Sequence, residues 1–256
     1  MRMTVIGCSG SYPGPDSSAS CYLLEAPDPY EPSRTWRILL DLGSGALGAL
    51  QRHVDPLTID AVFISHLHPD HFFDIAGYYV LRKYHPSGAQ PRIPVWGPRG
   101  IKSRVARAYG LPMDPGMNEE FRFRRIRRSR PMCVGPFTVT AQRMDHPIEA
   151  YAFRVVCGDR VLVYSGDTAK NDALVGFAEG AHLLLAEAAF RDGIDNPPNI
   201  HMTGSEAAAT AKEAGAAVLV LTHIPPWHDK QLAVQEAEGH FDGQVLLAAE
   251  GADYQV

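Results

Sequence analysis

Four residues of metal-ligating type lie within the seven-residue segment Ser65-His66-Leu67-His68-Pro69-Asp70-His71. It directly follows the apolar run 61–64, which is typical of a buried strand. In an extended segment, residues two apart point the same way, so His66 and His68 can face one metal ion. The intervening proline favours the first turn of a helix, so Asp70 and His71 leave the strand in another direction. The pattern HxHxDH therefore predicts ligands for two metal ions rather than one.

Three more side chains of metal-ligating type each follow an apolar strand further along the chain. They are His146, Asp167 and His223. In α/β folds, functional groups gather where strands end, so we expect these side chains to join the histidine motif. The complete expected set of metal ligands is His66, His68, Asp70, His71, His146, Asp167 and His223. Histidine and aspartate without thiolate suit zinc, manganese or iron, and we take zinc as the expected metal.

Composition excludes several classes of protein. The 256 residues are 45% hydrophobic and 21% charged, which excludes a disordered chain. Apolar runs of 18 residues are absent, so no transmembrane helix is expected. The net charge of −5 argues against nucleic-acid binding through bulk charge. The start of the chain reads as a strand rather than a signal peptide, and the four cysteines lack a CxxC pair, so we expect a cytoplasmic protein with reduced thiols.

The order of predicted elements indicates a layered α/β fold in one domain, 1–256. Strands are expected at 3–6, 21–24, 36–41, 61–64 and 93–96, with helices at 44–52 (started by Ser44), 70–84 and 98–109. Strands dominate 119–165, and from 170 onward helices alternate with strands. So many strands, with helices to cover them, suit two packed sheets with helices outside.

These residues resemble the metallo-β-lactamase superfamily, and within it the ribonuclease Z-like branch. The likeness covers nearly the whole chain: Gly7–Gly10, Asp41, HxHxDH at 66–71, and the later ligands in order. His146 leads straight into the aromatic strand 151–155, and Ser165-Gly166-Asp167-Thr168 also fits the phosphodiesterase branch. The resemblance implies a four-layer αβ/βα sandwich, with two mixed β-sheets flanked by helices and a two-metal site at one edge.

The same resemblance implies how the ligands divide between the ions. His66, His68 and His146 would hold one ion, Asp70, His71 and His223 the other, and Asp167 would bridge them. Asp70 and His201 are the expected catalytic residues: Asp70 would orient the attacking hydroxide between the metals, and His201 would act as general acid or phosphate clamp. Glu187 is expected to orient a histidine from outside the metal shell. The histidines expected to be structural or solvated are His53, His85, His182, His228 and His240.

Two departures from the family pattern bear on the substrate. Met202 follows His201 where ribonuclease Z carries a hydroxyl residue. In ribonuclease Z, an arm that clamps transfer RNA is usually inserted between the residues that correspond to His146 and Asp167. Here only 21 positions (167 − 146) separate these two residues, which leaves no room for such an arm. The whole sequence is most similar to short actinobacterial-type members of this superfamily that are assigned as atypical cyclic-nucleotide phosphodiesterases. That likeness implies a small phosphodiester substrate, 3′,5′-cyclic AMP hydrolysed to the 5′-monophosphate, and, by family analogy, a homodimer.

Other functions remain open at this point. A ribonuclease Z-like RNA-processing endonuclease, a lactonase or other ester hydrolase of the same fold, and a non-catalytic binding module are the alternatives. The intact ligand set argues against the last of these. The strongest local charge feature is the basic run 122–130, with six arginines. It is interpreted as a strand with one solvated arginine face, or else as a rim that attracts anionic substrates or RNA.

Overall fold

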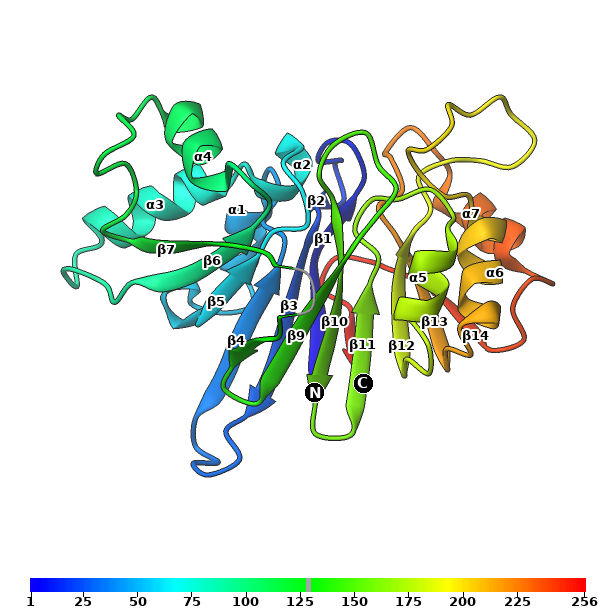
Figure 1. The fold of residues 1–256 in the computed structure, drawn as a ribbon, viewed down its shortest axis with the longest axis horizontal. Helices are drawn as coiled ribbons and strands as arrows, with labels where there is room; N and C mark the ends of the chain where they lie inside the picture. Colours follow the sequence, from blue (N-terminus) through cyan, green and yellow to red (C-terminus); the bar gives the residue numbers. More distant parts are fainter. Residues whose placement is uncertain (128–129) are drawn as a thin grey trace.

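Two β-sheets pack face to face, and helices cover their outer faces (Figure 1). This computed structural model describes residues 1–127 and 130–256. The first sheet has the order β15 (Asp253–Gln255), β1 (Arg2–Ser9), β3 (Cys21–Pro27), β4 (Thr35–Leu40), β5 (Ala61–Phe63), β6 (Ile93–Gly97) and β7 (Phe121–Arg125), with β2 (Ser18–Ala19) beside β1. The second has the order β14 (Gln244–Leu247), β13 (Val218–Thr222), β12 (Leu183–Glu187), β11 (Arg160–Tyr164), β10 (Tyr151–Cys157), β9 (Phe137–Arg143) and β8 (Met132–Val134).

The helices divide between the two outer faces. The first sheet is covered by α1 (Ala46–Leu50), η1 (Pro56–Thr58), α2 (Pro69–Phe72), α3 (Ile75–Tyr84) and α4 (Ile101–Tyr109), and the second by α5 (Asp172–Phe177), α6 (Gly204–Glu213) and α7 (Lys230–Ala237). Alternation along β5 shows how the layers form: Phe63 packs between the sheets, whereas Val62 packs against the helices. The four-layer sandwich and the mixed sheets predicted from the sequence are confirmed.

Strand direction brings the functional loops to one edge. The run β4, β5, β6 and β7 is parallel, and so is the run β11, β12, β13 and β14. Strand β9 points the same way as β11, because each is antiparallel to β10 between them. The carboxyl ends of parallel strands meet at the same edge of a sheet. The segments that follow β5, β9, β11 and β13 therefore emerge close together.

Three element boundaries differ from the sequence prediction. The first helix begins at Ala46 behind Gly45, whose φ is 82°, while the predicted cap Ser44 donates its hydroxyl to the Pro69 carbonyl instead. The predicted helix 70–84 is divided into α2 and α3. It breaks because the His71 carbonyl accepts the Leu42 N–H from the neighbouring segment instead of an N–H of its own helix. Helix α4 likewise starts only at Ile101.

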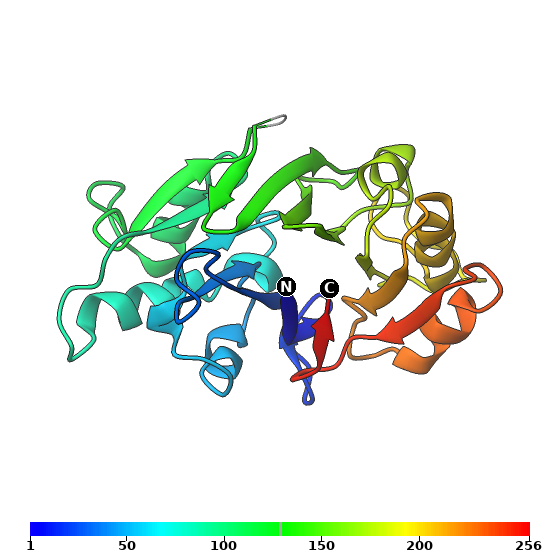
Figure 2. The same ribbon diagram turned by 90° about the horizontal axis from the view of Figure 1, so that it is seen from below.

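The C-terminal strand β15 was not predicted. It adds to β1 in antiparallel register, with Met3 opposite Tyr254, so the last residues return to the sheet that the first residues build. Figure 2 shows the two chain ends side by side. None of the helices in residues 1–127 and 130–256 combines the length and apolar character that a bilayer span requires.

Candidate metal centre

The histidine motif adopts the local structure that its sequence predicts. Strand β5 ends at Phe63, and the Ile64 N–H still donates to the Trp96 carbonyl of β6, so the backbone stays extended toward the motif. Pro69 occupies the first position of α2, where a backbone N–H would have no partner within the helix, so the lack of an N–H in proline costs no hydrogen bond. The chain therefore turns between His68 and Asp70, and the motif divides into two pairs of side chains.

The first group of ligand-type atoms contains three imidazoles and a carboxylate. His68 Nδ1 lies 3.0 Å from His66 Nε2 and 3.2 Å from His146 Nε2. Asp167 Oδ2 lies 3.4 Å from His66 Nε2. All four atoms fall within 4.8 Å of one another. Zinc with bonds of about 2.0–2.1 Å in a tetrahedral site places its ligand atoms about 3.3 Å apart, so this spacing suits one cation.

The second group shares Asp167 with the first. His71 Nε2 lies 3.4 Å from Asp70 Oδ2 and 3.2 Å from Asp167 Oδ1. His223 Nε2 lies 3.7 Å from Asp70 Oδ2 and 3.3 Å from Asp167 Oδ2. The Asp167 carboxylate thus contacts ligand-type nitrogens on both sides. The structure therefore brings together all seven residues that the sequence singled out as metal ligands, in two adjoining groups.

Buried polar atoms without partners show that the two groups suit metal ions. His71 and Asp167 are buried, yet His71 Nε2 and Asp167 Oδ1 have no hydrogen-bond partner among the described residues. Leaving such an atom unsatisfied costs about 1–3 kcal/mol, so buried polar atoms are normally paired. A divalent cation would satisfy both atoms. The nitrogen and carboxylate donors fit zinc, manganese or iron.

The electrostatics of the site favour the ligand-competent protonation state at three imidazoles and two carboxylates, but not at His71. Burial would lower the pKa of His71, but the carboxylates of Asp167, Asp70 and Asp41 outweigh it and raise that pKa, so a metal ion would have to displace a proton from this ring. Burial lowers the pKa of His66, His68 and His146, so these imidazoles are neutral at pH 7 and keep a lone pair for a metal. Burial acts to raise the pKa of Asp70 and Asp167, but the neighbouring imidazoles outweigh it and lower both values. Both aspartates are therefore ionised.

Partners outside the two groups fix the orientation of the imidazole rings. Where Nε2 faces the centre, Nδ1 is held from behind: His71 by Asp41 Oδ2 at 2.7 Å, His223 by Ser20 Oγ at 3.0 Å, His66 by Ser65 Oγ at 3.0 Å, and His146 by the Ile200 carbonyl at 3.0 Å. Such contacts set the tautomer and aim of a ligating ring. His68 differs, because its Nδ1 is the atom that faces the group.

Asp41 is the residue whose role the sequence interpretation missed. Its carboxylate is buried and accepts four hydrogen bonds: from His71 Nδ1 at 2.7 Å, the Ser65 N–H at 2.7 Å, the Ser65 hydroxyl at 2.8 Å and the Tyr164 hydroxyl at 2.8 Å. It stands in the left-handed region, with φ of 61°, just after β4. The available signal was an acidic residue at the end of an apolar strand.

Replacing Asp41 with asparagine is expected to weaken metal binding by about 10–100-fold, as loss of a partner behind a metal-bound histidine typically does. The amide preserves the volume of the side chain but removes the negative charge that holds His71. Competition with a chromogenic chelator measures the affinity, and Asp242→Asn, at an exposed position, is the matched control. An Asp41→Asn protein with unchanged affinity would show that Asp41 does not support the metal centre.

His201 lies beside the two groups, and with Asp167 and His223 it forms a third set of ligand-type atoms within 4.8 Å of one another. Its Nδ1 is 2.8 Å from Glu187 Oε1 and 4.0 Å from Asp167 Oδ2, and its ring centroid is 5.6 Å from that of His223. Glu187 is fully buried, and its carboxylate also accepts the Thr168 N–H at 2.8 Å and the Ala189 N–H at 3.2 Å. The histidine that the sequence expected Glu187 to orient is His201.

The Glu187 carboxylate determines the charge state of His201. Burial alone would lower the pKa of His201, but the hydrogen-bonded Glu187 outweighs it and raises that pKa to about 9. The ring is held in place from the next residues too, because Thr203 caps α6 through a capping box with Glu206, as its sequence predicts. His201 therefore combines a fixed position with a firmly held proton.

Met202 packs away from the centre. It is fully buried in the apolar layer between the second sheet and its helices, and its sulfur lies 3.9 Å from the Thr210 hydroxyl. A hydroxyl at position 202 would thus face this apolar layer. The five histidines expected to be structural lie outside the ligand groups; of these, His182 accepts the Val161 N–H and His85 contacts the Ser87 hydroxyl.

Comparison with known proteins places the chain in a family. The model for the beta-lactamase superfamily domain matches residues 36–224. An uncharacterized Mycobacterium tuberculosis protein, Rv1339, is 41% identical over 249 residues, covering 96% of this chain and 88% of its own length. A probable metallo-hydrolase of Bacillus subtilis, YhfI, is 31% identical over 98% of both chains.

Solved structures agree with this placement. The crystal structure of YhfI superposes with a TM-score of 0.86 at 30% identity, covering 99% of this chain and 98% of that one. The short form of human tRNase Z superposes with a TM-score of 0.77 at 25% identity, covering 100% and 99%. The chain therefore belongs to the beta-lactamase superfamily, as a metallo-hydrolase related to ribonuclease Z.

Proposed function

We propose that this chain is a phosphodiesterase with two zinc ions, which hydrolyses 3′,5′-cyclic nucleotides such as cyclic AMP to 5′-monophosphates. The observation that carries the proposal is the convergence of seven ligand-type residues around the shared Asp167 carboxylate. In this proposal, His66, His68 and His146 would hold one ion, Asp70, His71 and His223 would hold the other, and Asp167 would be shared between them. Residues 1–256 act as one hydrolase domain.

The metal ions supply Lewis acidity. When bound, two divalent cations lower the pKa of a water molecule toward 7 and neutralise charge on the phosphate oxygens. The chain's own residues supply position: the Asp70 carboxylate is ionised and accepts a hydrogen bond from an attacking water. The partners behind the imidazoles keep the ligand atoms in place, so little rearrangement is needed when substrate arrives.

His201 is the proposed general acid. Glu187 holds the Nδ1 side of the ring, so the proton that His201 can give away is the one on Nε2. Hydrolysis of a 3′,5′-cyclic phosphate breaks the bond from phosphorus to the 3′ oxygen, and that oxygen must gain a proton as it leaves. A positioned imidazolium provides it, and such transfer typically contributes about 10²–10⁴ in rate.

The absence of room for an RNA-binding arm supports a small substrate. Between His146 and Asp167 the chain forms only β10 and β11, joined by a tight turn at Gly158. The net charge of −5 also disfavours a large polyanion, because affinity for nucleic acid grows with the number of phosphates neutralised. A cyclic nucleotide carries a single negative charge and needs no extended grip.

RNA processing is the second candidate, and the relatives favour it. Ribonuclease Z of Myxococcus xanthus is 26% identical over 98% of this chain, and human tRNase Z shares the fold throughout. Both candidate functions hydrolyse a phosphodiester bond, and they differ in the size of the substrate.

A substrate panel separates the candidates. Zinc-loaded protein is assayed with cyclic AMP, cyclic GMP, 2′,3′-cyclic nucleotides, precursor transfer RNA and a lactone. The proposal predicts that a 3′,5′-cyclic nucleotide gives the highest kcat/KM. Preferred cleavage of precursor RNA would support the second candidate, and preferred hydrolysis of the lactone would overturn the phosphodiesterase assignment.

A further inference from the structure

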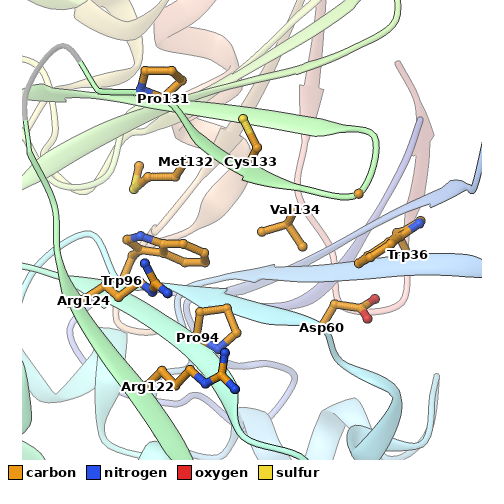
Figure 3. Close-up of a pocket in the computed structure, with 11 residues that line it drawn as sticks. Trp36, Asp60, Pro94, Trp96, Arg122, Arg124, Pro131, Met132, Cys133 and Val134 are labelled. Atoms are coloured by element: carbon orange, nitrogen blue, oxygen red, sulfur yellow. The ribbon is translucent and has the colours of Figure 1, made fainter.

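A cavity of about 490 Å³ lies between β8 and the inner face of the first sheet. None of its lining residues belongs to the metal-ligand groups. Figure 3 shows the side chains that define it: Pro94 and Trp96 of β6, Arg122 and Arg124 of β7, and Met132 and Val134 of β8. This second concave site, called here the arginine cavity, is unexplained by the proposed reaction.

The alternation of side chains along β7 points two arginines of the basic run toward this cavity. Phe121 and Phe123 of β7 pack on the helix-covered face of the first sheet, so Arg122 and Arg124 point to the opposite face. Their cross-strand partners on that face are Pro94 and Trp96. The arginine face that the sequence indicated therefore lines a cavity. Arg128 and Ser129 of the same run lie outside the described residues.

The two cavity arginines lack a counter-charge. Within residues 1–127 and 130–256, neither Arg122 nor Arg124 forms an ion pair with a carboxylate. The one acidic residue of the lining, Asp60, is already engaged by the Arg34 guanidinium at 3.3 Å and the Arg37 N–H at 2.8 Å. Two guanidinium groups beside open space are suited to an anion, above all to phosphate oxygens.

The aromatic residue beside these arginines can receive a planar ring. Trp96 is stacked on Phe63 on one side, with centroids 4.8 Å apart and an interplanar angle of 5°. On the Arg124 side, the guanidinium carbon lies 5.8 Å from the indole centroid, and the arginine side chain is exposed. A nucleobase could pack against this side of the indole while the guanidinium contacts its phosphate, since bases stack on aromatic side chains.

Trp36, the second tryptophan of the cavity, forms its end and offers no free face for a ring. A Cβ atom on Gly135 would fall 2.2 Å from the Trp36 ring, so backbone already covers that ring, and the Arg34 guanidinium carbon lies 3.7 Å from its centroid. Trp36 therefore forms an end wall. Met132 and Val134, which are both buried in the core between the sheets, form the apolar wall of the cavity on the β8 side. The cavity volume falls in the range of small-ligand sites.

We propose that the arginine cavity binds a mononucleotide, with its base against Trp96 and its phosphate on Arg122 and Arg124. This site is separate from the metal centre and does not depend on which bond that centre hydrolyses.

Trp96 provides a local readout, because its indole lines the cavity. Quenching of tryptophan emission is measured with metal-loaded protein and AMP, adenosine or inorganic phosphate. AMP at ten times its dissociation constant fills about ten sites in eleven, so saturable quenching is expected to reach about nine-tenths of its maximum. Trp96→Phe keeps an aromatic ring at this position and is expected to lose most of the quenching.

Variants connect the quenching to the two arginines. Arg122→Ala/Arg124→Ala is expected to abolish quenching by AMP, while Arg107→Ala, an exposed arginine of α4, keeps it. Asp167→Ala is also expected to keep it, so failure of the proposed phosphodiesterase function would not remove this result. Four outcomes would overturn the site: no quenching by millimolar AMP, equal quenching by phosphate alone, quenching that survives in Trp96→Phe, or quenching by an oligoribonucleotide but not by AMP.

Discussion

Replacing Asp167 with alanine is expected to abolish metal occupancy and turnover together. Its carboxylate lies within 3.4 Å of His66, His71 and His223, so its loss removes an oxygen ligand from both groups. It also leaves several buried imidazoles without a neighbouring negative charge. Metal content by elemental analysis and kcat on the preferred substrate are the two measurements.

A matched aspartate provides the control. Asp159→Ala removes an exposed carboxylate from the turn between β10 and β11 and is expected to leave metal content and kcat unchanged. Circular dichroism and thermal unfolding show whether the Asp167→Ala protein is folded. A folded Asp167→Ala protein that retains both metals and full activity would rule out the shared-carboxylate arrangement.

Replacing His201 with alanine is expected to give a different result: both metals stay and kcat falls by about 10²–10⁴-fold. Its ring is held by Glu187, and the two groups that contain the seven proposed ligands do not include it, although it also lies close to Asp167 and His223. The loss should depend on the leaving group. A substrate with a p-nitrophenolate leaving group needs no proton, so its hydrolysis should be slowed far less.

His240→Ala, at an exposed position, is the control for loss of an imidazole. The comparison of leaving groups distinguishes proton donation from a structural role, since a distorted site would slow both substrates equally. An His201→Ala protein as active as the parent on cyclic nucleotides would show that His201 takes no part in catalysis.

Local patterns made much of the fold and of the ligand set predictable. HxHxDH is a short segment whose backbone geometry follows from its own residues, and each later ligand lies within three residues of the end of a strand. The parallel strands then decide that these positions meet. The position of Asp41 at the end of an apolar strand marks it as a candidate, but no local pattern identifies His71 as its partner or separates α2 from α3, because both depend on contacts with the segment after β4.

The sequence also could not predict that arginines of the basic run 122–130 line a cavity. Alternation in Phe121–Arg125 shows that Arg122 and Arg124 share one face, but this face could have been open to solvent. Only the pairing of β7 with β6, and the position of β8 over that face, turn it into a cavity wall with Trp96. Pairing between strands that are far apart in the sequence, such as β15 with β1, produces no periodic pattern of residues from which it could be predicted.

The central claim is that imidazoles and carboxylates from separate loops form a site for two metal ions. Its most direct test is the metal content of the protein purified without chelators, measured by inductively coupled plasma mass spectrometry against protein concentration. The account predicts about two equivalents of transition metal per chain, reduced by Asp41→Asn and lost in Asp167→Ala. A protein that is active on its substrate with no bound transition metal would contradict it.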